Sequence, residues 1–281
     1  MTTNEAMRAR PAVPATASRS SAFGDWTQEV LALTKRWFIE LSRERMNLVF
    51  SVAQPALWLL FFGSGMGKAV DQSKIGTDDY IGFMLPGMIA FTIVGNGVSG
   101  AMPLMWDKEG GYLDKLMSMP IARSSIIVSR FVYQLALSLV QVAMLLVIAV
   151  ILQVGFATGP ASALVIVIAT TFLTLAVTAA FTGLAYYVPS HGTFFAVTGF
   201  VTLPLLFMSN AFVPVDAMPG WMAIVARLNP LTYAIGSMRS PIIDGWEGEI
   251  LVELVVLGAV ALACLAVGAK QFTTLTGDRV A

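Results

Sequence analysis

The sequence predicts an all-α polytopic membrane protein with six transmembrane helices and both termini in the cytoplasm. Only 12% of its 281 residues are charged and 57% are hydrophobic, whereas about 25% of the residues in a soluble domain are charged. Several apolar runs reach about 18 residues or more, which is enough for a helix to cross a bilayer. An N-terminal interfacial amphipathic helix and a short amphipathic helix in a cytoplasmic loop complete the predicted architecture.

Composition also excludes several functional classes. The formal net charge is zero, so no basic surface indicates binding to nucleic acid. Cys264 is the sole cysteine and His191 the sole histidine, which excludes a disulfide framework and multi-Cys or multi-His metal centres. Because His191 has no evident partner, we predict neither a catalytic site nor a metal site. Residues 1–25 lack the apolar core of a cleavable signal peptide.

The N-terminal region divides into a tail and a helix. Residues 1–23 are rich in Ala, Ser, Thr, Arg and Pro and predict a disordered tail. Residues 24–46 predict an amphipathic helix, because apolar residues recur at spacings of three and four. That apolar face holds Trp26, Val30, Leu33 and Trp37. Two tryptophans opposite basic side chains favour a helix that lies in the membrane interface. A cytosolic helix packed against a partner protein is the alternative.

Six apolar spans are expected within a transmembrane domain at 47–270. They lie at about 48–66, 80–102, 125–152, 161–187, 193–212 and 250–269. The second span is rich in glycine, which lets helix backbones approach closely and predicts a central position in the bundle. The third span carries Gln134, Ser138 and Gln141 on one face. In the fourth, threonines recur every four residues from Thr170 to Thr182, which favours helix packing over a substrate track.

An outer segment at 213–248 precedes the sixth span, and a cytoplasmic tail at 271–281 follows it. The prolines expected to break the outer segment are Pro214, Pro219, Pro230 and Pro241. Its aromatic residues favour a segment that lies along the outer interface or re-enters the membrane. The orientation follows from thirteen Lys and Arg residues in the inner segments and four in the outer ones.

Two stretches imitate nucleotide-binding motifs. Residues 63–69, GSGMGKA, are one residue short of a phosphate loop and lack the Ser or Thr that follows its lysine. Residues 95–100, GNGVSG, fit GxGxxG, but no strand precedes them and they lie within a predicted span. Close helix packing explains the second stretch better than dinucleotide binding does.

A charged interruption at 103–124 separates the second and third spans. Its charges cost about 2.5–3.5 kcal/mol each at the centre of a membrane helix, so the segment must lie in water. Gly110 and Gly111 are expected to break the preceding helix. Tyr112, Leu113, Leu116 and Met117 then share one face of a short turn that Pro120 ends. A helix this short needs a surface to dock on, and the pattern leaves both lipid headgroups and a partner protein open.

Residues 107–123, DKEGGYLDKLMSMPIAR, resemble the pattern (R/K)E(x)G(T)L(E)xLxxxPI(S/A)R of the type-2 ABC exporter permeases. About 110 residues later, NPLTYA at 229–234, with Met238 and Arg239 after it, resembles the motif before the last helix of that family. The resemblance covers about residues 25–275. It is strongest to the antibiotic-resistance and lipid exporters of the daunorubicin-resistance type, and polysaccharide exporters are more distant.

The resemblance implies that two permeases pair and that each engages a separate ABC ATPase subunit, which holds ATP and magnesium. No cofactor is expected on this chain. The interruption becomes a coupling segment that docks on the ATPase, together with the interfacial helix. Its coupling residues are Asp107, Lys108, Glu109, Gly111, Tyr112, Leu113, Leu116 and Pro120. Lys108 stands where the family often has Arg, and Tyr112 where it often has Thr.

The second and fifth spans are implied to line the substrate path. Candidate contacts there are Met88, Phe91, Asn96, Phe207 and Asn210, although hydrogen bonding between helices is the commoner role of asparagine in a span. The expected function is export of an amphipathic drug, antibiotic or lipid across a bacterial inner membrane. Export of a polysaccharide or glycolipid, proton-driven transport and a scaffold role are the alternatives. Acidic residues within the spans are scarce, which argues against a proton relay.

Overall fold

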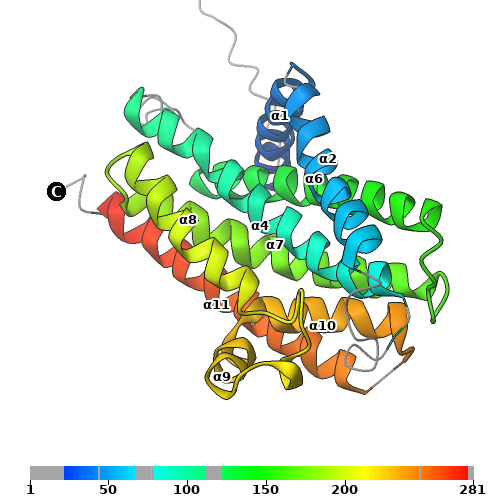
Figure 1. Ribbon diagram of the computed structural model, residues 1–281. Helices are drawn as coiled ribbons and strands as arrows, with labels where there is room; N and C mark the ends of the chain where they lie inside the picture. The colour runs from blue at the N-terminus through cyan, green and yellow to red at the C-terminus, as the bar shows by residue number, and fades with distance from the viewer. Residues whose placement is uncertain are drawn as a thin grey trace, which may run out of the picture.

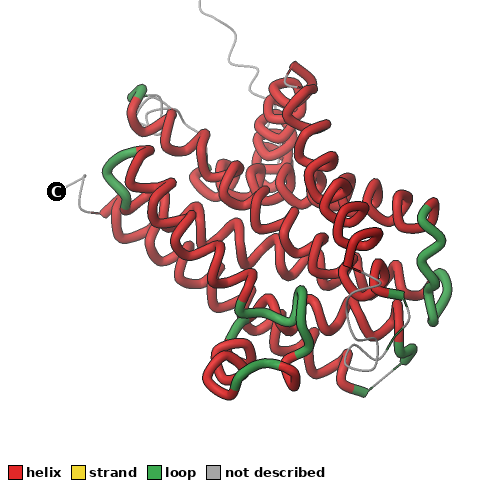
Figure 2. The backbone as a smooth tube through the Cα atoms, in the orientation of Figure 1, coloured by secondary structure: helices red, strands yellow, loops and turns green. Residues whose placement is uncertain are grey.

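The computed structural model describes residues 22–43, 45–66, 77, 79–111, 122–246 and 248–277. Within these ranges every regular element is helical, and short loops join most of them (Figures 1 and 2). The elements are α1 (Ala22–Arg43), α2 (Arg45–Met66), α4 (Tyr80–Glu109), α6 (Arg123–Ile151), α7 (Ala161–Tyr187), α8 (His191–Phe207), η1 (Val215–Ala217), α9 (Gly220–Leu228), α10 (Pro230–Ile243) and α11 (Glu249–Gly277). The expected tail at 1–23 falls almost entirely outside the described residues.

Helices α4 and α7 form the centre of the bundle. Helix α7 lies between α4 and α11, and α2 and α6 contact α4 (Figure 1). Phe83, Met84 and Ile89 of α4 are buried in the core. A Cβ atom at Gly97 would overlap the side chain of Val177 on α7, so glycine permits the close approach of these two helices. The expected central position of the second span is confirmed.

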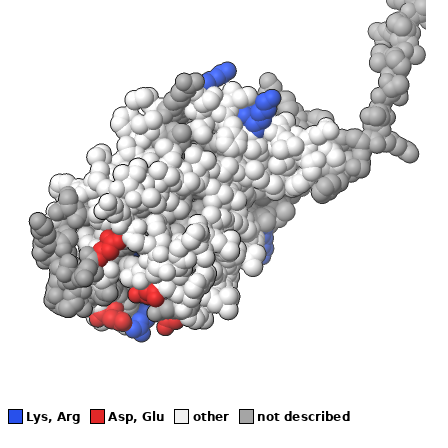
Figure 3. All heavy atoms as spheres, turned by 90° about the vertical axis from the view of Figure 1, so that its right-hand side faces the viewer, with Lys and Arg blue, Asp and Glu red and all other residues white. Residues whose placement is uncertain are grey.

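Four described helical segments are long and apolar enough to cross a membrane. They are Tyr80–Glu109, Ser124–Ile151, Ala161–Tyr187 and Glu249–Gly268. At the other two expected spans the apolar helices are shorter, Val49–Phe61 within α2 and His191–Phe207, whereas a helix of about 20 residues spans the hydrocarbon. One flank of the molecule is broadly uncharged, with acidic groups gathered toward one end (Figure 3). The described part of the chain is therefore all-helical, and four of its helices have the length and composition of membrane spans.

Helix α8 ends at Phe207, before the expected end of the fifth span at 212. The side-chain amide of Asn229 donates hydrogen bonds to the carbonyl oxygens of Leu205 (2.5 Å) and Met208 (3.0 Å). Its Oδ1 atom accepts from the backbone N–H of Leu231 at 3.0 Å, at the start of α10. Asn229 thus caps the end of one helix and the start of another, and Pro230 occupies the first turn of α10, where its missing N–H costs nothing.

The expected break at Pro241 is wrong, because α10 continues through it to Ile243. Proline inside a helix costs about 3 kcal/mol, but α10 is packed against α4, α7 and α11 and most of its side chains are buried. Arg239 of α10 donates to the carbonyl oxygens of Asn210 (2.6 Å) and Phe83 (3.2 Å), and its guanidinium lies 3.8 Å from the centre of the Phe83 ring. Tertiary packing therefore outweighs the local preference.

Candidate functional site: the two anchors of the coupling segment

Helix α4 continues without a break past the expected end of the second span and carries the first of the predicted coupling residues at its tip. It ends at Glu109, and a turn at Gly110 and Gly111 follows. Gly111 has a φ of +68°, a left-handed conformation that glycine adopts without a steric penalty. The expected helix break is therefore confirmed. The remaining coupling residues, Tyr112, Leu113, Leu116 and Pro120, lie outside the described residues.

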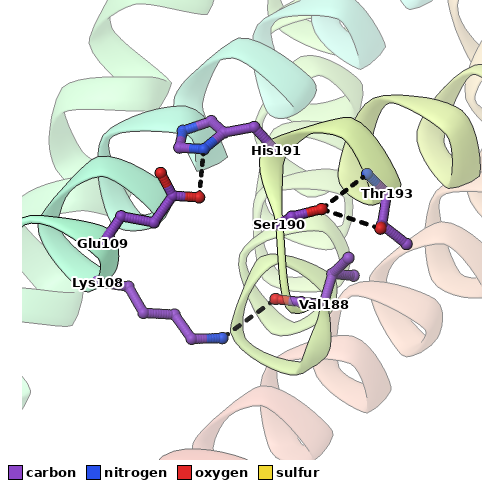
Figure 4. A network of polar contacts seen from close by, with 6 residues as sticks. All are labelled: Lys108, Glu109, Val188, Ser190, His191 and Thr193. Carbon is purple, nitrogen blue, oxygen red and sulfur yellow. Dashed lines mark hydrogen bonds and ion pairs between the residues drawn. The ribbon is translucent and has the colours of Figure 1, made fainter.

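Lys108 binds the end of α7. Its Nζ atom donates to the carbonyl oxygens of Tyr186 (2.8 Å) and Val188 (3.1 Å), as Figure 4 shows for Val188. The last carbonyl groups of a helix have no partner within the helix, and the helix dipole places negative charge there. The Lys108 ammonium group donates hydrogen bonds to these carbonyl oxygens and places a positive charge beside them. Lys108 therefore joins the tip of α4 to the C-terminus of α7.

Glu109 binds the start of α8. Its Oε1 atom lies 2.6 Å from Nδ1 of His191, the first residue of α8 (Figure 4). Ser190 precedes it and accepts from the backbone N–H of Thr193 at 3.3 Å, which caps the helix. The expectation that His191 has no partner is wrong, because the α7–α8 corner brings it back to α4 across 82 residues of sequence.

Asp107 faces a third helix. One of its carboxylate oxygens lies 3.8 Å from the guanidinium of Arg130 on α6, and both side chains are largely buried. The Arg130 guanidinium also lies 5.2 Å from the ring centre of Trp37 on α1. Three consecutive residues of α4 thus contact α6, the end of α7 and the start of α8. We name these contacts the upstream anchor.

The other end of the coupling segment is held by α1. The Glu29 carboxylate accepts hydrogen bonds from the backbone N–H of Ala122 (3.0 Å) and the hydroxyl of Ser125 (2.8 Å). The indole N–H of Trp26 donates to the hydroxyl of Ser124 at 3.0 Å. Ala122 offers no side-chain cap to α6, so Glu29 supplies the acceptor and the negative charge that a helix N-terminus favours. We name these contacts the downstream anchor.

The apolar face of α1 packs on α6 of the same chain. Val30 and Thr34 are buried there, and the rings of Trp37 and Tyr133 lie 6.1 Å apart between centres. Neither sequence interpretation of this face, lipid or a partner protein, included α6. On the rest of α1, Leu31, Phe38 and Ile39 remain exposed.

The five candidate path residues do not converge on one place. Met88 is buried in the core, Phe91 is half-buried, and Phe207 is exposed and stacked on Phe212. Asn210 is buried beside Arg239. Asn96 donates to Oε1 of Gln141 and to the hydroxyl of Ser138 (3.4 Å), so it bonds α4 to α6. Of the five, Asn96 alone lines a cavity of about 350 Å³ among the described helices.

A family model described as ABC-2 type transporter matches residues 28–243. The chain belongs to this family. A putative transport permease, ycf38, of Cyanophora paradoxa is 36% identical over 214 residues, which cover 75% of this chain and 73% of the relative. A probable doxorubicin resistance ABC transporter permease protein, DrrC, of Mycobacterium tuberculosis is 24% identical over 254 residues, 88% of this chain and 90% of the relative. A daunorubicin resistance ABC transporter permease protein, DrrB1, of Streptomyces coeruleorubidus is 26% identical over 197 residues, 69% and 68% of the two chains.

Sequence reasoning located the charged interruption of this ABC-2 permease, whose coupling role stays a prediction, but it missed two residues that hold the ends of that segment. Glu29 had a usable signal, since it lies three residues after Trp26 and four before Leu33 and so shares their face of α1. An acid on an apolar face calls for a partner. His191 had no comparable signal, because only the fold brings it to Glu109. Within the described ranges, no three His, Cys, Asp or Glu side chains gather as metal ligands would.

Proposed function

We propose that this ABC-2 permease is the membrane subunit of an ATP-driven exporter. Its substrate is an amphipathic drug, antibiotic or lipid-like molecule that leaves the cytoplasm or the inner leaflet. Two permeases pair, and each engages a separate ABC ATPase subunit that binds ATP and magnesium, while this chain binds neither. The family match and the names of the drug-resistance relatives support this class of function.

The observation that carries the proposal is the pair of anchors. The upstream anchor joins the entry of the coupling segment to α6, α7 and α8, and the downstream anchor joins its exit to α1 and α6. A segment held at both ends by polar contacts passes a displacement to the helices that hold it. A loop that merely rested on lipid would gain little from such contacts.

In this mechanism the helical turn that the sequence predicts at 112–117 docks on the ATPase through Leu113 and Leu116. Movement of that turn pulls on Glu109 and Lys108, which shifts the α7–α8 corner. The same movement pulls on Ala122 and Ser125, which shifts α6 and α1 together. Helices α4 and α8, which correspond to the second and fifth spans, then change their separation and move the substrate path between inward-open and outward-open states.

The membrane topology of the chain is also part of the proposal. Six helices cross a bacterial inner membrane with both termini in the cytoplasm, as the distribution of Lys and Arg favours. The tip of α4, the α7–α8 corner and the end of α11 gather at one end of the molecule (Figure 1), which is the arrangement this topology requires. A tag placed after Lys74 should then be accessible from outside intact cells.

The deciding experiment reconstitutes the permease with its ABC ATPase in proteoliposomes and follows daunorubicin transport. We expect ATP-dependent export only when both proteins are present. Leu113→Asp combined with Leu116→Asp should abolish co-purification of the ATPase, whereas Ser118→Asp, which helical periodicity predicts on the opposite face, should preserve it. Proton-driven flux by the permease alone, or full co-purification of the double variant, would contradict the proposal.

A further inference from the structure

A cavity of about 350 Å³ lies among α1, α2, α4, α6 and α8. Its volume falls within the range of about 300–1,000 Å³ that small-molecule sites occupy. Aromatic side chains from four helices form much of its wall. They are Trp37 of α1, Trp106 of α4, Tyr133 of α6 and Phe195 of α8. Such a wall offers flat apolar surface to a ring system.

Gln134 of α6 is the unusual member of the lining. Its side chain is 2% exposed, and across the described part of the chain its amide nitrogen has no hydrogen-bond partner. Gly100 of α4 leaves room for this side chain, because a Cβ atom there would lie 2.5 Å from Oε1 of Gln134. The absent side chain lets the carboxamide lie at the cavity wall. A buried N–H donor without an acceptor is unfavourable, and it calls for a group that occupies the cavity.

The deep end of the cavity is polar but already satisfied. Asn96 donates to Gln141, and Gln141 donates to the hydroxyl of Ser51 at 2.6 Å. These residues bond three helices together and leave Gln134 as the amide donor that awaits an acceptor. From Asn96 to Trp106 the lining extends about 15 Å along α4, so a ligand here meets amides at one end and aromatic rings toward the other.

The charge of the lining residues further limits the kind of ligand that fits the cavity. Among the lining residues that the structure describes, Arg130 is the one with a charged side chain, and the Asp107 carboxylate lies 3.8 Å from it. The pair brings no net charge to the cavity, which favours a neutral ligand over an anion. An acyl lipid fits poorly, because its chain would lie against Gln134 and leave the donor without an acceptor. Inorganic phosphate fits poorly as well, because it would make no use of the aromatic wall.

We propose that this cavity binds a compact, planar aromatic compound that carries carbonyl or hydroxyl oxygens, and that Gln134 donates a hydrogen bond to one of them. The ring system lies against Trp37, Tyr133 and Phe195. The inference that this ligand binds depends only on the cavity and on Gln134. The further step, that this ligand is the exported substrate, rests on the proposed function.

The test uses the purified full-length permease in lipid nanodiscs, without ATPase or ATP, and follows quenching of tryptophan fluorescence. The probe is 1,4-dihydroxyanthraquinone, and anthracene is its matched control, with the same three rings and no oxygen. We expect saturable binding of the quinone and about tenfold weaker binding of anthracene, the difference that one hydrogen bond makes. Gln134→Leu should remove this preference and leave anthracene binding unchanged.

Two further variants make the result decisive. Gln54→Leu, at an exposed position on α2 outside the cavity, is the matched control and should bind as the unaltered protein does. Ser99→Phe, at an exposed position on the cavity rim, should fill the space and abolish saturable binding of both compounds. Loss of saturable binding in the Ser99→Phe variant supports the site even if Gln134→Leu fails to fold. The fluorescence quenching that remains in this variant measures partition of the probes into lipid.

Two results would overturn the proposal: equal affinities for the two probes, or an undiminished quinone affinity in either Gln134→Leu or Ser99→Phe. The cavity would then be a site that holds only water. The outcome is independent of transport. Quinone binding without ATP-dependent export would count against the exporter function and leave the site intact. Export that persists without saturable binding would remove the site and leave the exporter function standing.

Discussion

The Glu109 carboxylate lies 2.6 Å from Nδ1 of His191, which joins the last turn of α4 to the first turn of α8. Both side chains are partly exposed, His191 at 24% and Glu109 at 49%, and such pairs contribute only about 0.2–1 kcal/mol to stability. The contact therefore matters less for folding than for linking two helices that the proposed mechanism moves relative to each other.

Replacing His191 by Ala should lower ATP-driven transport several-fold while the ATPase still co-purifies. The free energy of unfolding should fall by about 1 kcal/mol or less, since the pair is partly solvated. Transport by proteoliposomes and thermal unfolding separate the two effects. Gly192→Ala is the matched control, because a Cβ atom there meets nothing within 4 Å. Unchanged transport by the His191 variant would remove this contact from the coupling path.

Replacing Lys108 by Gln should destabilise the C-terminus of α7 by about 0.3–1 kcal/mol, the usual effect of a cation at a helix C-terminus. Lys108→Glu should have a larger effect, because it places a negative charge beside the Tyr186 and Val188 carbonyl oxygens. Lys108→Arg should be tolerated, since it keeps the charge and the donors. Hydrogen exchange of the last turn of α7 measures this directly, and equal protection in the Gln and Arg variants would refute the assignment.

Local chemistry explains what the sequence predicted correctly. Helices occupy all six expected apolar segments, because hydrophobic content and length are properties of each segment alone. The close packing at Gly97 and the helix break at Gly110 follow from what a glycine permits sterically. The polar face of the third span, Gln134, Ser138 and Gln141, is buried as a unit because helical periodicity places its members together.

Long-range packing explains the rest. The partner of α1 is α6, about 95 residues away, and a periodic pattern identifies a face without identifying what covers it. Glu29 and His191 meet their partners only because the bundle brings distant turns together. Helix α10 keeps Pro241 in its interior because three neighbouring helices hold it. Helix α8 ends at Phe207, before the end of the fifth apolar segment, because Asn229 supplies a cap from a later loop.

Glu29 makes the downstream anchor directly testable. Glu29→Ala should destabilise the protein by about 0.5–2 kcal/mol, the usual cost of losing a helix cap, and should uncouple ATP hydrolysis from transport. Glu29→Gln keeps an acceptor oxygen and should recover part of the loss. Lys35→Ala, at an exposed position on α1, controls for general effects on this helix. Equal stability of the Glu29→Ala and Lys35→Ala variants would show that α6 does not depend on this cap.

The side chain of Asn229 has two roles that substitutions can separate, since it caps the end of α8 and the start of α10. Asn229→Asp keeps the oxygen that accepts from Leu231 at the start of α10 but loses the N–H donors to Leu205 and Met208 at the end of α8. Because the new carboxylate faces two carbonyl oxygens, we expect a loss of about 1–3 kcal/mol. Asn229→Ala removes both caps without adding this repulsion. Hydrogen exchange should therefore show fraying of α8 alone in the Asp variant and of both helices in the Ala variant. Equal fraying of α10 in both variants would mean that Asn229 does not cap α10 through its side-chain oxygen.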